Sequence, residues 1–279
     1  MARPEGSQSR VMVLTGAASG IGRHLAGRLL REGHRLLATD VDETRLRTAA
    51  RDDGWPTDRA LLHVHDVRDA RAWPGVVDLA VRAWGRLDVM LNVAGVLRPS
   101  RAHAHDAADV DLHLDVNAKG VIHGTRTAAA RMVEQGHGHV VNIASLAGHC
   151  PVPGLALYAA SKFAVRGFSL AAALELRPHG VFVSVVCPDA VQTPMLDRQV
   201  PFPEAALSFS GARPLTVEEV TGAIVESVLV KRPLEVLIPG PRGVLARATS
   251  VWPGLALRLA PLMTRRGAER QQALLRSRS

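Results

Sequence analysis

Three side chains between residues 145 and 162 have the types and spacing needed for acid–base chemistry on an oxygen atom. Ser145 is followed 13 residues later by Tyr158, and Lys162 lies four residues further on. Side chains four residues apart share one face of a helix, so Tyr158 and Lys162 are expected to point the same way. A neighbouring ammonium group favours the phenolate and should lower the tyrosine pKa from about 10. Tyr158 could then act as a general acid or base, with the Ser145 hydroxyl bonded to a substrate carbonyl.

The same spacing of tyrosine and lysine also occurs in ordinary amphipathic helices, where both side chains are simply exposed. Tyr158 is the only tyrosine in the 279 residues, and Ser145 ends an apolar run that is predicted to be a strand. The chemical interpretation therefore depends on the elements that precede the helix.

A glycine-rich turn near the N-terminus could bind a phosphate group. Residues 10–15 are predicted to form a buried strand and residues 21–32 a helix, with Gly16, Gly20 and Gly22 at the turn between them. Glycine lets the backbone turn tightly and lets a diphosphate approach the N-terminus of the helix. Such a turn also occurs without a ligand, but the order strand, turn, helix favours a dinucleotide site.

An acidic residue ends the second predicted strand, at residues 35–40. Asp40 lies 18 positions after Gly22, where a carboxylate can accept hydrogen bonds from both ribose hydroxyls of NAD and repel a 2′-phosphate. Alternatively, Asp40 lies at an exposed strand end or caps a helix. The glycine turn upstream favours the ribose role, and therefore NAD as the cofactor.

Strands and helices alternate along the chain. Apolar runs predict strands at residues 10–15, 35–40, 61–65, 87–95, 139–145, 181–186 and 234–239. Helical patterns cover residues 21–32, 69–84, about 106–135 with a bend near Gly120, 157–177 and 216–230. Continuously apolar strands that alternate with helices are typical of a parallel sheet covered on both faces, which predicts a doubly wound α/β fold.

Composition and charge exclude several classes of protein. An apolar content of 47% excludes global disorder, and no apolar run reaches the roughly 18 residues of a membrane span. The polar N-terminus predicts no signal peptide. The two cysteines, Cys150 and Cys187, suit a reducing cytoplasm and predict no disulfide framework.

The net charge of +8 is concentrated at the C-terminus. Residues 242–279 contain eight arginines and one glutamate, and the rest of the chain is nearly neutral. Aromatic residues make up only 4%, which is few for base stacking, so no nucleic-acid partner is expected. The histidine pairs at 63 and 65 and at 137 and 139 have no third ligand at a usual spacing, so no metal site is expected.

Residues 10–240 resemble the short-chain dehydrogenase/reductase family. The segment TGAASGIG matches the cofactor loop of this family, and NVAG at residues 92–95 matches its Asn-x-Ala-Gly motif. The four catalytic positions of the family are matched, in order, by Asn117, Ser145, Tyr158 and Lys162.

The resemblance implies one Rossmann-type domain with a seven-stranded, mainly parallel sheet in the order 3-2-1-4-5-6-7. It also implies NAD as the cofactor. The residues that would bind it are Gly16, Ser19, Gly20, Ile21, Gly22, Asp40, Asp66, Val67, Asn92, Ala94, Gly95, Tyr158, Lys162, Val191 and Thr193.

The resemblance further implies a role for each catalytic residue. Tyr158 would exchange a proton with the substrate oxygen, and Ser145 would hold and polarise that oxygen. Lys162 would bind the nicotinamide ribose and lower the pKa of Tyr158. Asn117 would hold a water molecule that connects Lys162 to solvent, by way of a bent helix backbone.

A mostly apolar substrate pocket is expected from three loops. The pocket residues would be Leu97, Ser145, Leu155, Tyr158, Asp189 and Met195. Asp189 replaces a glycine that the family usually has after the sixth strand. It either faces the pocket, where it would disfavour anionic substrates, or points to solvent or caps the next segment.

A basic, amphipathic extension over residues 241–279 follows a catalytic domain over residues 1–240. Its apolar residues keep helical spacing on both sides of Pro253. The extension could close over the pocket, dock on a neighbouring subunit or lie on an anionic membrane surface. The simplest alternative is a segment that packs on its own subunit and ends in a frayed, arginine-rich stretch.

The expected function is the interconversion of a secondary alcohol and a ketone with NAD(H), on an apolar and uncharged substrate. The alternatives are an NADP-dependent 3-oxoacyl thioester reductase, against which Asp40 argues, and a non-catalytic NAD-binding regulator, which would not need all four catalytic residues. A cytoplasmic homo-oligomer, a dimer or tetramer, is expected.

Overall fold

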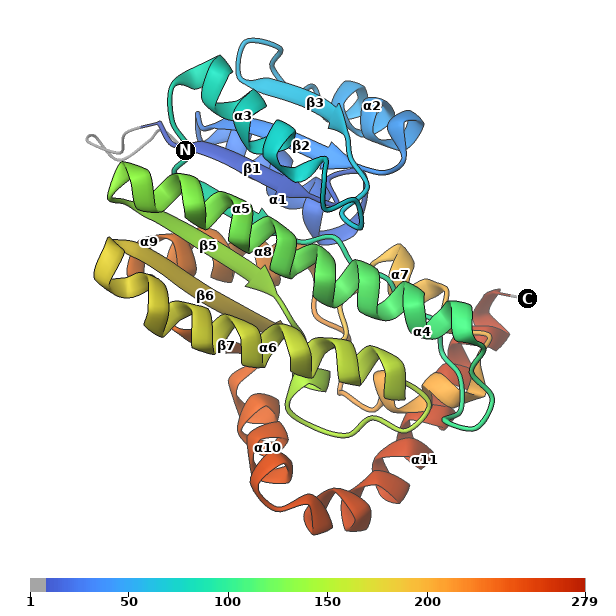
Figure 1. The fold of residues 1–279 in the computed structure, drawn as a ribbon. Helices are drawn as coiled ribbons and strands as arrows, with labels where there is room; N and C mark the ends of the chain where they lie inside the picture. The colour runs from blue at the N-terminus through green and yellow to red at the C-terminus, as the bar shows by residue number, and fades with distance from the viewer. Residues whose placement is uncertain (1–8, 279) are drawn as a thin grey trace.

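The computed structural model describes residues 9–278 and contains one seven-stranded parallel sheet (Figure 1). The strands lie in the order β3-β2-β1-β4-β5-β6-β7, as predicted. Their bounds are Val11–Thr15 for β1, Arg35–Asp40 for β2, Ala60–Val64 for β3, Val89–Asn92 for β4, Gly138–Ile143 for β5, Val181–Pro188 for β6 and Glu235–Ile238 for β7.

The register of the strands brings their carboxyl ends to one edge of the sheet. Thr15 of β1 pairs with Thr39 of β2, and Asn92 of β4 pairs with Asn142 of β5. Because all strands are parallel, the turns that follow them open on the same edge. Ligands of doubly wound sheets bind at this edge, at the point where the strand order reverses.

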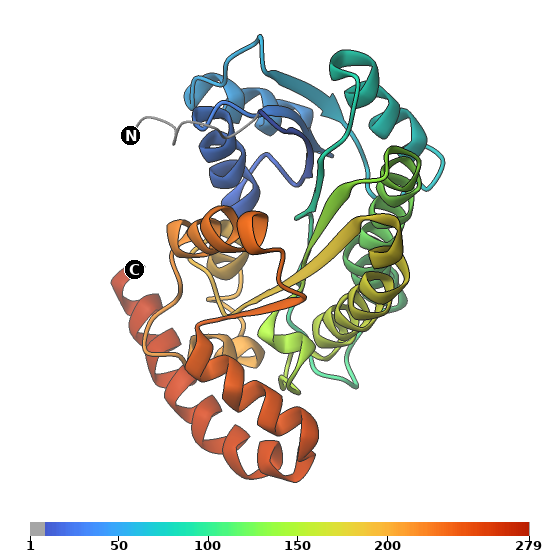
Figure 2. The ribbon, with the colours of Figure 1, turned by 90° about the vertical axis from the view of Figure 1, so that its left-hand side faces the viewer.

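Helices cover both faces of the sheet, and each face has its own apolar core (Figure 2). One face carries α1 (Gly20–Arg31), α2 (Glu43–Asp52), α8 (Val217–Gly222) and α9 (Leu229–Lys231), with a π-helical stretch, Ala223–Val228, between the last two. The other face carries α3 (Trp73–Trp84), α5 (Gly120–Gln135) and α6 (Ala156–Leu176).

Two helical details differ from the sequence prediction. α3 begins at Trp73, later than expected, because the preceding residues form turns in which the Asp69 amide bonds to the Asp66 carbonyl. α2 was not predicted; its N-terminus is capped by the Asp42 carboxylate, which accepts a hydrogen bond from the Arg45 amide.

The long helical region after β4 is distorted in its middle. It consists of α4 (Ala107–His113), a π-helical turn (Leu114–Lys119) and α5. The expected bend thus precedes Gly120 and contains Asn117. π-Helical turns are rare and often occur at functional sites.

Short helical segments follow β5, α6 and β6. They are the 3-10 turns Leu146–Gly148 and Arg177–His179, α7 (Pro194–Asp197) and the 3-10 segment Pro203–Phe209. No helix among residues 9–278 is long and apolar enough to cross a membrane.

The C-terminal extension forms two helices, α10 (Gly240–Val251) and α11 (Pro253–Arg278). In Figures 1 and 2 they make a V at one end of the molecule. Pro253 separates them, as the sequence predicted. α11 continues to Arg278.

α11 is fixed to the loop at residues 193–210. The buried Gln271 amide donates hydrogen bonds to the carbonyls of Gln199, Val200 and Phe202 at 3.1, 2.9 and 2.7 Å. Gly267 lies against Ala206 so closely that a Cβ atom would overlap the Ala206 carbonyl. The extension is therefore a packed part of the structure.

Candidate active site

A groove runs along the carboxyl edge of the sheet, over the ends of β1, β2 and β4. Most of the expected cofactor residues line it: Gly16, Ser19, Gly20, Ile21, Gly22, Asp40, Asp66, Val67, Ala94, Gly95 and Thr193. The turn after β4 is held to β1 by Thr15, whose hydroxyl accepts hydrogen bonds from the amides of Val93 and Ala94 at 3.1 and 3.2 Å.

The glycines of the first turn have a steric reason to be glycines. Gly16 and Gly20 have φ angles of +74° and +53°, which favour residues without a Cβ atom. A Cβ atom on Gly22 would overlap the Gly16 carbonyl. The N-terminus of α1 consequently faces the groove at close range, and an unobstructed helix N-terminus suits a diphosphate.

Asp40 lies at the wall of this groove. Its Oδ2 accepts a hydrogen bond from the Ala18 amide at 3.0 Å, and its Oδ1 accepts one from the Asp42 amide at 3.0 Å. The helix-cap alternative is wrong, because Asp42 caps α2. These two amides orient the carboxylate between the glycine turn and the exposed Val41, which also lines the groove.

Tyr158 and Lys162 project from α6 toward the ends of β5 and β6. The Lys162 Nζ lies 5.6 Å from the centroid of the Tyr158 ring and donates a hydrogen bond to the Ile143 carbonyl at 2.9 Å. Ser145 caps the 3-10 turn that follows β5: its hydroxyl accepts a hydrogen bond from the Ala147 amide at 3.1 Å and donates one to the Pro188 carbonyl at 3.3 Å, and it lines the same pocket as Tyr158 and Lys162. The three side chains that the sequence separates are therefore neighbours.

The expected lowering of the Tyr158 pKa is not found. Burial raises the pKa of Tyr158 to about 12 and outweighs the hydrogen bond with Ser145, which acts to lower it. Burial also lowers the pKa of Lys162 to about 8. The ammonium group of Lys162 alone would lower the Tyr158 pKa, but burial removes water from both groups, and this loss of hydration is visible only in the folded structure.

Asn117 lies fully buried behind this group and lines neither the groove nor the pocket. Its Oδ1 accepts a hydrogen bond from the Val96 amide at 2.8 Å, and its Nδ2 donates to the Ser161 hydroxyl at 3.0 Å. A Cβ atom on Gly95 would come within 3.3 Å of that oxygen and 3.7 Å of the Lys162 Nζ. Asn117 thus ties the turn after β4 to the helix of Lys162.

Asn92 also lies outside the groove lining. Its side chain is buried and donates hydrogen bonds to Thr125 at 3.3 Å and to Asn142 at 2.8 Å. In this structure Asn92 connects β4 to β5 and α5.

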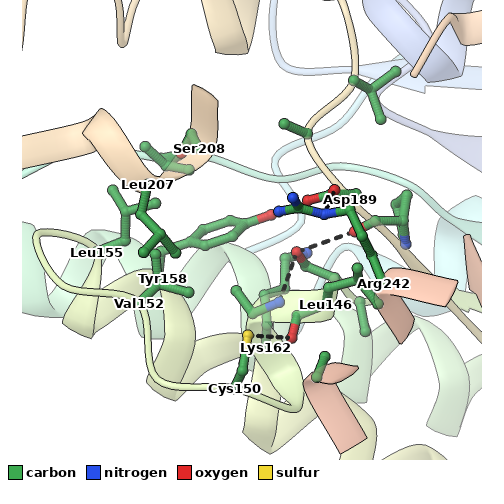
Figure 3. A pocket seen from close by; sticks show the side chains of 18 of the residues that line it. Leu146, Cys150, Val152, Leu155, Tyr158, Lys162, Asp189, Leu207, Ser208 and Arg242 are labelled. Carbon is green, nitrogen blue, oxygen red and sulfur yellow. Dashed lines mark hydrogen bonds and ion pairs between the residues drawn. The ribbon is translucent and has the colours of Figure 1, made fainter. Parts of the chain in front are cut away.

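An apolar pocket that includes Tyr158 adjoins the groove; Figure 3 shows this pocket. Its lining includes the expected substrate residues Leu97, Ser145, Leu155, Tyr158, Asp189 and Met195, and also Lys162 and Val191. Groove and pocket share the residues Ile21, Val93, Gly95, Thr193 and Met195. The pocket volume is about 200 Å³; an apolar cavity of roughly 150 Å³ holds a benzene ring.

The C-terminal helices supply one wall of this pocket. The wall consists of Arg242, Leu245, Ala246 and Thr249 of α10 with Ala256, Leu259, Ala260 and Met263 of α11. One alternative in the sequence analysis was that the extension closes over the pocket, but none of these residues was predicted individually. The signal was present in α11, where residues 256, 259, 260 and 263 recur at helical spacing.

Asp189 faces the pocket, so the solvent alternative is wrong. Arg242 forms an ion pair with it, and the side chains of Asp189 and Arg242 are 18% and 28% exposed (Figure 3). Burial raises the pKa of Asp189, and Arg242 acts in the opposite direction. Asp189 could be singled out from the sequence, but its partner Arg242 could not, because the two residues are distant in the chain.

A second ionic cluster lies behind the pocket at the end of β7. Glu235 accepts hydrogen bonds from Arg166 at 2.6 Å and from Arg247, and lies 3.0 Å from His149. Burial acts to raise the pKa of Glu235, but hydrogen bonds from His149, Arg166 and Arg247 hold it well below its usual range. His149, Cys187 and Glu235 are close enough to share a metal ion, but the two guanidinium groups already neutralise the carboxylate.

Comparison with known proteins agrees with this geometry. The model of the short chain dehydrogenase family matches residues 10–203. The chain belongs to the short-chain dehydrogenase family. It is therefore an oxidoreductase with the Rossmann-type fold of this family.

Three relatives illustrate the range within this family. The chain is 35% identical over 195 residues to the (2S)-[(R)-hydroxy(phenyl)methyl]succinyl-CoA dehydrogenase subunit BbsD of Thauera aromatica, covering 69% of this chain and 77% of that one. It is 35% identical over 236 residues to the short-chain reductase protein NovJ of Streptomyces niveus, covering 81% and 88%. A short-chain dehydrogenase/reductase of Burkholderia phymatum, crystallised with NAD, superposes with a TM-score of 0.79 at 27% identity, covering 91% and 95%.

Proposed function

We propose that this short-chain dehydrogenase interconverts a secondary alcohol and a ketone with NAD(H), on an apolar and uncharged substrate. The observation that carries the proposal is that Tyr158 and Ser145 line the apolar pocket, which shares five lining residues with the glycine-lined groove. A cofactor in the groove and a substrate in the pocket would therefore meet at two hydroxyl groups.

The proposed mechanism gives each side chain one task. In the oxidation direction Tyr158, as a phenolate favoured by Lys162 and by the positive ring of bound NAD+, would accept the proton of the substrate hydroxyl, while Ser145 would donate a hydrogen bond to the same oxygen. NAD(H), when bound in the groove, would supply the hydride chemistry. With a pKa of about 8, Lys162 is mostly protonated at pH 7 and would stabilise the phenolate.

Asn117 is proposed to act through Lys162. Its hydrogen bonds to the turn at Val96 and to Ser161 fix the π-helical turn next to the lysine. Its proposed task, to hold a water molecule that connects Lys162 to solvent, is consistent with this fixed backbone.

NAD is proposed over NADP because of Asp40. The groove fits a dinucleotide: the glycine turn leaves the N-terminus of α1 open to a diphosphate, and a carboxylate stands at the end of β2. Asp66 and Val67 line the same groove and would contact the adenine. Val191 and Thr193, at the pocket end, are proposed to bond the nicotinamide carboxamide. Asn92 does not line the groove, and we propose that it supports the cofactor site indirectly, through its hydrogen bonds to Thr125 and Asn142.

The pocket argues for an apolar substrate without charge. Leucine, alanine, valine and methionine side chains dominate its lining, and the Asp189 carboxylate is already paired with Arg242. The alternative, a 3-oxoacyl thioester reductase that uses NADP, has Asp40 against it. A catalytic domain at residues 1–240, with an extension that completes the substrate pocket, is the organisation that we propose. A homo-oligomer in the cytoplasm remains part of the proposal.

A turnover assay tests the proposal directly. The purified chain is incubated with NAD+ and a panel of apolar secondary alcohols, and NADH is followed by its absorbance. The proposal is supported if the wild type oxidises at least one alcohol and the Tyr158→Phe variant does not oxidise it. NAD binding without turnover of any alcohol, or of the matching ketones with NADH, would support a regulator.

A further inference from the structure

The V formed by α10 and α11 has an outer face that the pocket does not use. Five large apolar side chains of these two helices are exposed and do not line the pocket, and we call this set the tip face: Val244, Val251, Trp252, Leu257 and Leu262. Leu257 is 80% exposed and Trp252 66% exposed. Both views of the fold place this V at an extremity of the molecule (Figures 1 and 2).

The packing of the two helices does not need the tip face. The inner faces, with Ala246 and Thr249 of α10 and Ala256 and Met263 of α11, line the pocket and are mostly buried. Exposed aliphatic and aromatic side chains that gather in one place mark an interaction surface.

The charges around the tip face are all positive. Residues 240–268 contain five arginines and no aspartate or glutamate. Arg242 and Arg247 are engaged by Asp189 and Glu235. Within the described part of the chain, Arg258 and Arg266 form no ion pair, and both are exposed beside Leu257 and Leu262.

We propose that the tip face docks this protein on an anionic membrane surface. Arginines interleaved with tryptophan and leucine on one helix face are typical of segments that lie in the membrane interface. A tryptophan at the corner of the V can sit at the level of the headgroups. A second copy of the chain is a poorer occupant, because two tip faces would bring guanidinium groups together without carboxylates between them.

Docking in this way would set the substrate pocket beside the lipid. Val244 belongs to the tip face, and the next residue, Leu245, lines the pocket and is 36% exposed. The same turn of α10 therefore contributes to both surfaces. An apolar compound dissolved in the membrane would have a short path to the pocket.

Binding of the full-length protein to vesicles tests the proposal without any assay of activity. The vesicles contain phosphatidylcholine alone or phosphatidylcholine with phosphatidylglycerol. Trp252 is an intrinsic probe, because Trp55 and Trp73 are buried and Trp84 is partly buried. Co-sedimentation with the anionic vesicles and a blue shift of the tryptophan emission are expected, and both should weaken as salt is added.

Matched variants separate docking from unspecific attraction. Trp252→Glu, which also removes the fluorescent probe, should abolish the co-sedimentation. The double variant Arg258→Gln/Arg266→Gln should weaken vesicle binding by roughly thirtyfold. Val230→Glu, a change at an exposed residue of α9, should leave binding unchanged.

Three results would overturn the proposal. The first is no binding to anionic vesicles at low salt by a folded wild-type protein. The second is an equal loss of binding in Val230→Glu and Trp252→Glu. The third is self-association in sedimentation velocity that Trp252→Glu removes, since the tip face would then be a contact between copies.

Discussion

Asp189, just after β6, and Arg242, in the first turn of α10, form an ion pair inside a mostly apolar pocket. The pair joins the loop beside the groove to the C-terminal extension. It also explains how a carboxylate can replace the usual glycine of the family without making the pocket acidic.

Removing one partner of this pair should be more harmful than removing both. Arg242→Gln leaves a largely buried carboxylate without its cation and should lower the free energy of unfolding by about 1–3 kcal/mol. The double variant Asp189→Asn/Arg242→Gln should recover most of this loss. Urea denaturation of the wild type, both single variants and the double variant measures the coupling. Strictly additive losses would mean that the pair contributes nothing.

Tyr158→Phe should abolish turnover and keep cofactor binding. The phenol is the proposed acid or base, a role worth roughly 10²–10⁴-fold in rate, whereas the groove holds the cofactor through many other residues. Steady-state kinetics and NAD titration measure the two effects separately. A loss of activity below about tenfold would exclude Tyr158 from this role.

The cofactor preference should follow Asp40. The double variant Asp40→Ala/Val41→Arg removes the repulsion of a 2′-phosphate and adds a guanidinium at an exposed residue of the groove wall. The ratio of kcat/KM for NADP to that for NAD should rise by roughly tenfold or more. Val41→Gln is the uncharged control. Equal use of both cofactors by the wild type would contradict the assignment.

Filling the wall that α11 provides should change substrate size selection. Ala260→Phe places a ring in the pocket and should lower kcat/KM for bulky alcohols by roughly tenfold or more, with little effect on small ones. Leu262→Phe, on the outer face of the same helix, is the matched control. NAD affinity should stay the same in both variants. An equal effect of the two changes would mean that α11 does not contact the substrate.

The cluster at Glu235 should make stability depend on pH in a defined direction. Its carboxyl pKa is held below the usual value, so the stabilisation is present above about pH 4.5 and is lost as the pH falls through the folded-state pKa. At pH 7, Glu235→Gln should cost about 3 kcal/mol. The difference in Tm from the wild type should shrink toward pH 3. Glu226→Gln, in an exposed pair with Arg28, should change Tm little at either pH.

The sheet could be predicted from the sequence because each strand contains an apolar run, a pattern typical of parallel strands that are covered on both faces. α2 was missed because its sequence, ETRLRTAARD, is mostly polar and only Leu46 and Ala49 are buried. The groove could be predicted because the spacing of Gly16, Gly20 and Gly22 reflects the local backbone geometry of the turn between β1 and α1.

Other features of the site depend on contacts that the sequence does not encode locally. The spacing of Tyr158 and Lys162 gave their proximity correctly, but the direction of the tyrosine pKa depends on burial, which only the folded structure provides. Likewise, Asp189 stands out in the sequence because it replaces a glycine of the family pattern, but nothing in the sequence connects it to Arg242, which belongs to the basic extension. Long-range pairs of this kind have no periodic pattern.

The attachment of Gln271 to three carbonyls of the 193–210 loop has a consequence for how this chain can diversify. The region matched by the family model ends at residue 203, so the three carbonyls lie at its end, and the segment Pro203–Phe209, which also packs on α11, lies mostly beyond it. The loop at residues 193–210 and α11 therefore form one structural unit, which could be exchanged between relatives while the catalytic domain stays the same. Exchanging α11 alone between relatives would leave the three loop carbonyls without donors, whereas exchanging loop and helix together would transfer an intact pocket wall.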